Sequence, residues 1–173
     1  MKLLVVVDMQ KDFVDGALGT PEAAAIVPKV AEKLAARRAA GWRVVFTRDT
    51  HTEDYLNTQE GRNLPVPHCI RGTSGWEIIP ELPTLDSLIL DKPTFGSQEM
   101  ARYAAGSEEL EEIELVGLCT DICVISNALL LKAFLPEVEI AVDAACCAGV
   151  TPESHRTALR AMEACQITVE NDG

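Results

Sequence analysis

Short apolar runs rich in β-branched residues recur along this sequence of 173 residues, with longer helical or polar stretches between them. Each run has the continuous apolar character of a strand that is buried on both faces, as strands of parallel sheets are. The six predicted strands are Leu3–Val7, Val44–Thr47, Leu88–Leu90, Ile113–Val116, Ile140–Val142 and Ile167–Val169. Strands that alternate with helices predict an α/β fold, in which helices cover both faces of a mostly parallel sheet.

Three helices are predicted by apolar positions at helical spacing and by residues typical of helix ends. They run over Pro21–Ala40, from near Thr120 to about Phe134, and from Pro152 to about Cys165. Thr120 and Thr151 are the expected N-caps of the second and third helix. No repeat, low-complexity tract or interdomain linker interrupts this rhythm, so residues 1–173 are expected to form one domain.

The formal net charge of −12 arises from 27 acidic and 15 basic side chains. No run of Lys or Arg offsets this charge locally, so a nucleic-acid partner is not expected. The apolar run Leu3–Val7 is too short to span a membrane, and it lacks the cleavage site of a signal peptide. We therefore expect a cytoplasmic protein with no membrane partner.

The chain has six cysteines, which are Cys69, Cys119, Cys123, Cys146, Cys147 and Cys165. An even number is compatible with disulfides, but a reducing cytosol and a core of sufficient size argue against them. Most of the six are expected to be small buried hydrophobic residues. Cys123 is expected to differ because of the residues around it.

Polar side chains follow several of the predicted strands at the point where each strand ends. Asp8 follows the first strand, Asp49 and His51 the second, Lys92 the third, and Cys123 lies after the fourth. Ligands and catalytic groups of open parallel sheets gather outside the carboxyl ends of the strands. These side chains are therefore expected to converge on one rim of the sheet.

Cys123 is expected in the first turn of the helix that Thr120 caps. Free backbone N–H groups and the helix dipole favour a thiolate there, and the same N–H groups could bind the oxyanion of a tetrahedral intermediate. In such an arrangement, Asp8 would accept the proton of the sulfur while Lys92 stabilises the anion. The combination indicates a cysteine nucleophile.

Each of these residues alone has a simpler explanation. A cysteine between a strand and a helix is more often a buried structural residue, and an Asp or Lys at a strand end is usually solvated. Cys119 and Cys123 could form a redox or metal pair, but they lack the spacing of the common C-x-x-C motifs. The interpretation as a catalytic site therefore depends on all of the residues together.

Three segments resemble the signature segments of the isochorismatase-like hydrolases in order, spacing and position at strand ends. They are Asp8–Phe13 (DMQKDF), Asp91–Ser97 (DKPTFGS) and Gly117–Val124 (GLCTDICV). The resemblance implies a three-layer, Rossmann-like fold with a six-stranded parallel sheet, and a catalytic triad of Asp8, Lys92 and Cys123. It also implies a cis peptide bond before Cys119, an oxyanion hole formed by the N–H groups of Cys119 and Cys123, and a homo-oligomer, for which the sequence shows no interface.

The segment from Asp49 to about Asp86 lacks a regular pattern, and long segments of this kind within a compact domain are commonly functional or disordered. Asp49, His51 and His68 offer one carboxylate and two imidazoles. This donor set suits one divalent ion such as Zn²⁺, Fe²⁺ or Mn²⁺. The alternative is that both histidines are ordinary surface residues of a loop.

Asp49, His51 and His68 match the metal-binding positions of the nicotinamidase branch of this family, positions that its isochorismatase and carbamoylsarcosine-type members generally lack. Some nicotinamidases place a further His between these positions and others a Glu. Glu60 lies at the register of the Glu and is the expected fourth ligand, with Glu53 and Asp54 as competing acids nearby.

The same resemblance points to two aromatic residues at the substrate pocket. Phe13 matches the residue that stacks on the substrate ring, and Phe95 is expected to line the same pocket. Many nicotinamidases also carry a Trp or Phe shortly before the second metal-binding His. Here Leu64 and Val66 stand in this region, so the predicted pocket wall is aliphatic and the choice of substrate is open.

The leading hypothesis is a nicotinamidase that hydrolyses nicotinamide to nicotinate and ammonia through a thioester on Cys123, with one divalent metal ion that orients the amide substrate. A second hypothesis keeps the triad in a metal-independent hydrolase of another small amide or of isochorismate. A third is a non-catalytic binding protein on a flavodoxin-like scaffold. Activity in the presence of a chelator separates the first two, and labelling of Cys123 by a small electrophile tests the third.

Overall fold

Strands and helices alternate along the chain, in a computed structural model that describes residues 1–173. The elements are β1 (Lys2–Val7), α1 (Lys11–Val14), α2 (Pro21–Ala39), β2 (Arg43–Asp49), α3 (Gln59–Asn63), β3 (Leu88–Lys92), α4 (Gln98–Ala105), β4 (Glu112–Leu118), α5 (Ile125–Phe134), β5 (Glu139–Ala148), α6 (Pro152–Ala164) and β6 (Thr168–Glu170). Two short 3-10 helices, Tyr55–Asn57 and Ser74–Trp76, and a π-helical turn, Thr120–Val124, lie between them.

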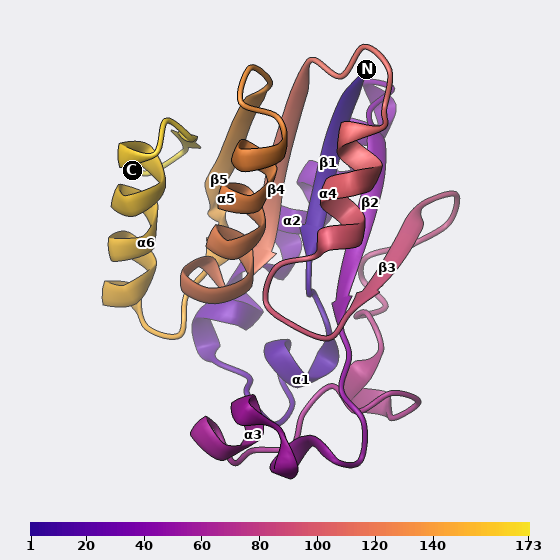
Figure 1. Ribbon diagram of the computed structural model, residues 1–173, viewed down its shortest axis with the longest axis vertical. Coiled ribbons are helices and arrows are strands. Elements are labelled where there is room, and N and C mark those ends of the chain that lie inside the picture. The colour runs from indigo at the N-terminus through magenta and orange to yellow at the C-terminus, as the bar shows by residue number, and fades with distance from the viewer.

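The six strands form one parallel sheet in the order β3-β2-β1-β4-β5-β6. The chain starts in the central strand β1, adds β2 and β3 on one side, and then returns to add β4, β5 and β6 on the other. Helices α4, α5 and α6 cover one face and α2 covers the other (Figure 1). The predicted three-layer α/β fold is therefore confirmed. The order of the strands reverses between β1 and β4, which is where open α/β sheets bind ligands.

The residues of β1 alternate between two hydrophobic cores, one on each face of the sheet. Leu3, Val5 and Val7 pack with apolar residues of α4, α5 and α6. Leu4 and Val6 pack with apolar residues of α2 on the opposite face. All five side chains are fully buried, which explains why the run has no polar alternation.

The outermost strands are less buried than their sequences predict. The prediction of burial on both faces is wrong for β3 and β6, in which most residues are exposed or only half-buried. Both strands lie at a border of the sheet and have a single neighbour. Each of the six predicted strands exists, and β5 extends well past its predicted end at Val142, through an irregularity opposite Leu115–Gly117.

Helices α2 and α6 end within one residue of their predicted ends, and Thr151 caps α6 as predicted. The helix predicted from Thr120 differs in its first turn, where Val124 N–H donates to the carbonyl of Cys119 (3.0 Å) in a π-helical turn, and the α-helix begins only at Ile125. Helix α4 was not predicted. None of the helices combines the length and the apolar character that a membrane span requires.

A cluster of buried charges joins α2 to β4 and β5. Lys33 Nζ lies 2.7 Å from Glu114 Oε1 and 2.7 Å from Asp143 Oδ2, and Arg37 Nε lies 2.5 Å from Glu114 Oε2. Both acids are almost fully buried. Burial opposes ionisation of Asp143, but the bond from Lys33 and its positive charge outweigh burial and lower the pKa of Asp143. The sequence patterns did not predict this cluster.

All six cysteines are free thiols. Four of the six are buried, as expected for most of them, whereas Cys119 is half-buried and Cys165 is exposed at the end of α6. Cys146 is buried next to the charged cluster, and burial raises the pKa of its thiol to about 12.

Candidate active site and metal centre

Asp8, Lys92 and Cys123 meet at the carboxyl ends of the strands. Asp8 follows β1, Lys92 is the last residue of β3, and Cys123 lies in the π-helical turn after β4. Lys92 Nζ lies 2.6 Å from Asp8 Oδ2 and 3.4 Å from Cys123 Sγ. The structure thus brings together three of the residues that were predicted to converge, and all three are buried.

Burial dominates the electrostatics of this group. It raises the pKa of the Asp8 carboxyl, and the neighbouring ammonium of Lys92 opposes this rise. Burial alone would lower the pKa of Lys92, but the charges of Asp8, Cys123 and Asp49 outweigh it and raise the pKa. Burial and the Asp8 carboxylate raise the pKa of Cys123 well above its usual value. These shifts oppose a resting thiolate at Cys123, because burial disfavours the charged form of the thiol more than the ammonium of Lys92 favours it.

Two neighbours that the sequence did not indicate fix the triad in place. Thr47 Oγ1 donates to Asp8 Oδ1 (2.7 Å), and Asp8 N–H donates to the carbonyl of Thr47 (3.2 Å). Lys92 Nζ also donates to the carbonyl of Thr94 (3.0 Å). The register of the sheet explains the first contact, because β1 pairs Val7 with Thr47 and leaves Asp8 just beyond.

The turn that carries Cys123 is held by side-chain bonds to the β5–α6 region. Thr120 does not cap the helix as predicted; its buried Oγ1 instead lies 2.7 Å from His155 Nδ1 on α6. Asp121 Oδ1 accepts a hydrogen bond from the N–H of Val150 (3.0 Å). The peptide bond between Leu118 and Cys119 is cis, as the resemblance implied.

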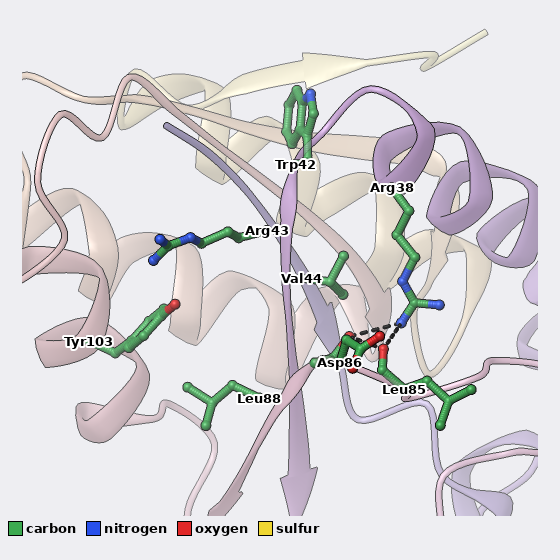
Figure 2. A pocket seen from close by; sticks show the side chains of 9 residues that line it. Arg38, Trp42, Arg43, Val44, Leu85, Asp86, Leu88 and Tyr103 are labelled. Carbon is green, nitrogen blue, oxygen red and sulfur yellow. Dashed lines mark hydrogen bonds between the residues drawn. The ribbon is translucent and has the colours of Figure 1, made fainter.

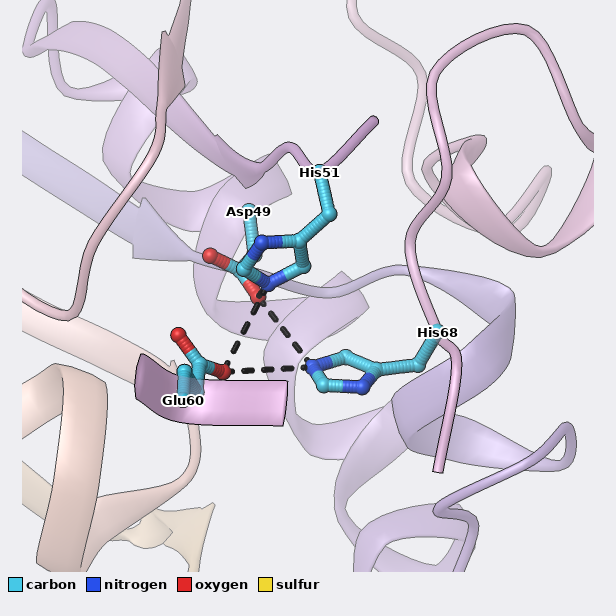
Figure 3. A group of neighbouring side chains, drawn as sticks. All are labelled: Asp49, His51, Glu60 and His68. Atoms are coloured by element: carbon cyan, nitrogen blue, oxygen red, sulfur yellow. Dashed lines mark hydrogen bonds and ion pairs between the residues drawn. The ribbon is translucent and has the colours of Figure 1, made fainter. Parts of the chain in front are cut away.

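A second group of side chains lies beside the triad and has the composition of a metal centre. One donor atom from each of Asp49, His51, Glu60 and His68 lies within 4.8 Å of all the others (Figure 3). His51 Nε2 lies 3.0 Å from Asp49 Oδ2 and 3.5 Å from Glu60 Oε1. His68 Nε2 lies 3.5 Å and 3.6 Å from the same two oxygens.

These separations fit a small divalent ion. Four donors at about 2.1 Å from a tetrahedral ion lie about 3.4 Å from one another. His68 Nδ1 lies 2.8 Å from the carbonyl of Val66, so it can carry the proton and leave Nε2 free to bind a metal. The residues therefore fit one divalent ion. Glu53 and Asp54, the competing acids, are exposed and lie outside this group.

Burial, hydrogen bonds and charges within this group shift the pKa values of Asp49, His68 and Glu60. Burial would raise the pKa of Asp49, but hydrogen bonds from His51 and His68 outweigh it and hold the pKa well below its usual value. Burial would lower the pKa of His68, but the bond to Asp49 raises it. Burial and the charge of Asp49 raise the pKa of Glu60. A metal ion must displace protons from such a group in order to bind.

The segment after β2 is more regular than its sequence suggests, and this order places the donors. It contains α3, which carries Glu60, and both 3-10 helices. His51 N–H donates to the carbonyl of Cys69 (2.9 Å), and Arg71 N–H donates to the carbonyl of His51 (2.9 Å). This short parallel bridge extends β2 and brings His68 next to His51.

Two further residues position the donors and were not predicted to do so. Gln10 is fully buried and binds the backbone of Asp49 twice: its Nε2 donates to the carbonyl (2.8 Å) and its Oε1 accepts from the N–H (2.7 Å). Tyr55 packs its ring 4.7 Å from that of His51 and 5.0 Å from that of His68. Gln10 lies in the motif that carries Asp8, whereas no sequence signal marks Tyr55.

A cavity of about 530 Å³ joins the two groups. Cys119 and Cys123 line one part of it, and Asp49, Glu60 and His68 line another. Phe13 and Phe95 also line it, at the positions expected for substrate contacts. The remaining wall combines the aliphatic residues Leu18, Ala23, Leu64, Ile122 and Val150 with the polar residues Thr20, Gln59, Asn63 and Thr94.

A second hollow lies at the opposite, amino-terminal end of β2 and β3 (Figure 2). Its lining includes Arg38, Arg43, Trp42 and Tyr103, and Arg38 is already bonded to the carbonyl of Leu85 and to the hydroxyl of Ser87. Neither a thiol nor an imidazole lines this hollow. The cavity at the carboxyl ends of the strands is therefore the candidate active site.

Comparison with known proteins places the chain in a family. The isochorismatase domain family matches residues 2–171. The chain belongs to the isochorismatase family. It is accordingly a hydrolase of that family, with the parallel six-stranded sheet of its structural neighbours.

Three isochorismatase-family relatives illustrate the similarity. The pyrazinamidase of Pyrococcus horikoshii, solved in complex with zinc, is 32% identical with a TM-score of 0.84, and the match covers 97% of each chain. The nicotinamidase/pyrazinamidase of Mycobacterium tuberculosis is 28% identical over 74% of this chain and 77% of its own. The N-carbamoylsarcosine amidase of Thermoplasma acidophilum is 28% identical with a TM-score of 0.77, over 98% of this chain and 95% of its own.

Proposed function

We propose that this protein is a nicotinamidase, which hydrolyses nicotinamide to nicotinate and ammonia with Cys123 as the nucleophile. One observation carries the proposal: a single cavity has the buried thiol beside Asp8 and Lys92 at one part of its wall, and a group of metal donors at another. The similarity to a nicotinamidase/pyrazinamidase and to a zinc-bound pyrazinamidase supports an amide as the substrate.

In the first half of the reaction, Cys123 Sγ attacks the amide carbon while its proton moves to Asp8. The raised pKa of Asp8 makes this carboxylate a better base than an exposed one. Collapse of the tetrahedral intermediate leaves a thioester, as Asp8 passes the proton to the departing ammonia. Lys92 stabilises the negative charge as it passes between Asp8 and the sulfur, from 2.6 Å and 3.4 Å respectively.

In the second half, Asp8 accepts a proton from water while the water oxygen attacks the thioester carbon. The acid is released, and the proton returns to the sulfur. We assign the oxyanion of both tetrahedral intermediates to the N–H groups of Cys119 and Cys123, which lie on the turn that lines the cavity.

Asp49, His51, Glu60 and His68 would hold the divalent ion, whose expected identity is zinc, iron or manganese. When bound, the ion supplies a positive anchor for the ring nitrogen of a pyridine carboxamide. The ring of Phe13 lies 5.5 Å from the ring of His68, on the same cavity. It would therefore limit the rotation of a substrate ring bound next to His68. We assign Phe13 and Phe95 to the substrate-binding wall.

A second candidate is a metal-independent hydrolase of another small amide or of isochorismate. The aliphatic wall formed by Leu18, Leu64 and Val150 favours it, because no aromatic residue stands there to stack on a pyridine ring. An N-carbamoylsarcosine amidase among the structural neighbours shows that the fold also accommodates a different amide.

The test is ammonia release from nicotinamide and a panel of small amides, with and without a chelator. We expect nicotinamide turnover that the chelator removes and that Zn²⁺, Fe²⁺ or Mn²⁺ restores. Cys123→Ala should retain the fold and lose turnover by at least about a thousandfold. Appreciable turnover by this variant would contradict the cysteine mechanism, and full activity under chelation would favour the second candidate.

A further inference from the structure

We propose that Asn127 is a positioning residue, which fixes the backbone of Cys123 relative to the segment Pro93–Ser97, here named the clamp loop. Its effect on turnover rests on the proposed function. Asn127 lies on α5, four residues after Cys123, and its side chain is fully buried. It does not line the cavity, so it would act through the residues that it binds.

The side-chain amide of Asn127 both donates and accepts hydrogen bonds. Nδ2 donates to the carbonyl of Cys123 (2.8 Å) and to the carbonyl of Phe95 (3.2 Å). Oδ1 accepts a hydrogen bond from the N–H of Ser97 (2.8 Å). One side chain thus joins the nucleophile's own backbone to two points of the clamp loop.

The clamp loop is also tied to the triad at its other end. It follows Lys92 directly, and Lys92 Nζ donates to the carbonyl of Thr94 (3.0 Å). Gly96 lies against the backbone of Ser126 in α5. A closed path therefore runs from Lys92 through the clamp loop and Asn127 to the backbone of Cys123, and it maintains the 3.4 Å contact between Nζ and Sγ.

The alternative is that Asn127 contributes only to stability, by satisfying two buried backbone groups and one that is partly buried. Such groups are costly when they are left without partners. The two roles differ in what they predict. A structural residue lowers activity only as far as it lowers the folded fraction, whereas a positioning residue lowers kcat of the folded enzyme, because small displacements of reacting groups are costly.

Ser97→Ala provides a matched control in the same loop. Ser97 Oγ accepts from the N–H of Met100 (3.1 Å) and caps α4, so its loss weakens this helix and leaves the three bonds of Asn127 in place. We would compare Asn127→Ala, Asn127→Asp and Ser97→Ala by thermal unfolding and by kcat and KM. Asn127→Asp keeps an acceptor for Ser97 N–H and loses the donor to both carbonyls.

Both Asn127 variants should lower kcat of the folded enzyme by roughly 10- to 100-fold, with a smaller change in KM. Ser97→Ala should retain kcat. Wild-type kcat in Asn127→Ala, or an equal fall in Ser97→Ala at the same loss of stability, would overturn the proposal. If neither Asn127 variant folds while Ser97→Ala does, Asn127 is a structural residue and the proposal is wrong.

Hydrogen exchange tests the clamp without any substrate. The backbone amide of residue 97, which donates to Asn127 Oδ1, should exchange at least about tenfold faster in Asn127→Ala than in wild type, and at the wild-type rate in Ser97→Ala. Unchanged exchange in Asn127→Ala would contradict the clamp. A wild-type protein that hydrolyses no amide would contradict the proposed function alone, because the exchange result does not depend on turnover.

Discussion

Replacement of Glu60 by Gln tests whether the metal centre uses four protein ligands. Glu60 Oε1 lies 3.5 Å from His51 Nε2 and 3.6 Å from His68 Nε2, close to the separation of about 3.4 Å expected around a tetrahedral zinc ion. Gln keeps the length of the side chain and a neutral carbonyl oxygen, but it removes the negative charge. The substitution therefore changes one property of one donor.

The expected loss follows from the position of Glu60 among the donors. Replacement of a residue that only orients a ligand costs roughly 10- to 100-fold in metal affinity. A charged direct ligand should reach at least the upper end of this range, so we expect Zn²⁺ affinity to fall by at least about 100-fold, or about 2.8 kcal/mol. Competition with a chromophoric chelator at neutral pH measures this difference.

Asp54→Asn is the matched control for the change of charge. Asp54 is an exposed acid of the same segment that does not belong to the donor group, so its loss should change Zn²⁺ affinity by no more than about twofold. Wild-type affinity in Glu60→Gln would refute the four-ligand centre and leave Asp49, His51 and His68 as the protein donors. An equal fall in Zn²⁺ affinity in both variants would show that the effect comes from the change of net charge.

Two further predictions concern buried charges. Lys92→Met should abolish turnover and lower the free energy of unfolding, measured in urea, by about 3–5 kcal/mol. The reason is that it leaves Asp8 and Asp49 buried without their shared cation. An unchanged urea midpoint would contradict this prediction. The pKa of Asp143 is lowered in the folded state, so its stabilising contribution is complete above the unfolded pKa and is lost as pH falls through the folded pKa. Asp143→Asn should therefore be less stable than wild type at neutral pH, and the difference should shrink below about pH 4; a difference that stays constant with pH would refute it.

The strands and the rim could be predicted because both depend on patterns that are local in the sequence. A strand buried on both faces needs a continuous apolar run, and a parallel sheet places the residue after each such run at a common edge. Asp8 and Lys92 could be expected to meet for this reason, and Lys92 Nζ lies 2.6 Å from Asp8 Oδ2. The edge strands β3 and β6 are less buried than their apolar runs predicted, because no single run encodes the order of the strands in the sheet.

Three features depend on contacts across the fold, and local patterns could not reveal them. The pKa of Cys123 is raised because the surrounding core leaves only 4% of the residue exposed, whereas its position at a helix start favours a lowered pKa. Thr120 has the residue type of an N-cap but bonds His155 on α6. Asn127 looks like an ordinary polar residue of a helix, although its bonds reach a loop 30 residues earlier in the chain.

Asp49 makes the metal donors and the triad one electrostatic unit. Its Oδ2 lies 3.0 Å from His51 Nε2, and its Oδ1 lies 3.4 Å from Lys92 Nζ, since the register of β2 and β3 pairs Asp49 with Lys92. A divalent ion at the donors would attract the charge of Asp49 and leave Lys92 to Asp8 and the sulfur. Without an ion, Lys92 faces all three groups. An ion at the proposed metal centre would therefore change the charge balance at Cys123 through one carboxylate. In a metal-independent hydrolase, Asp49 would serve only as a partner of Lys92.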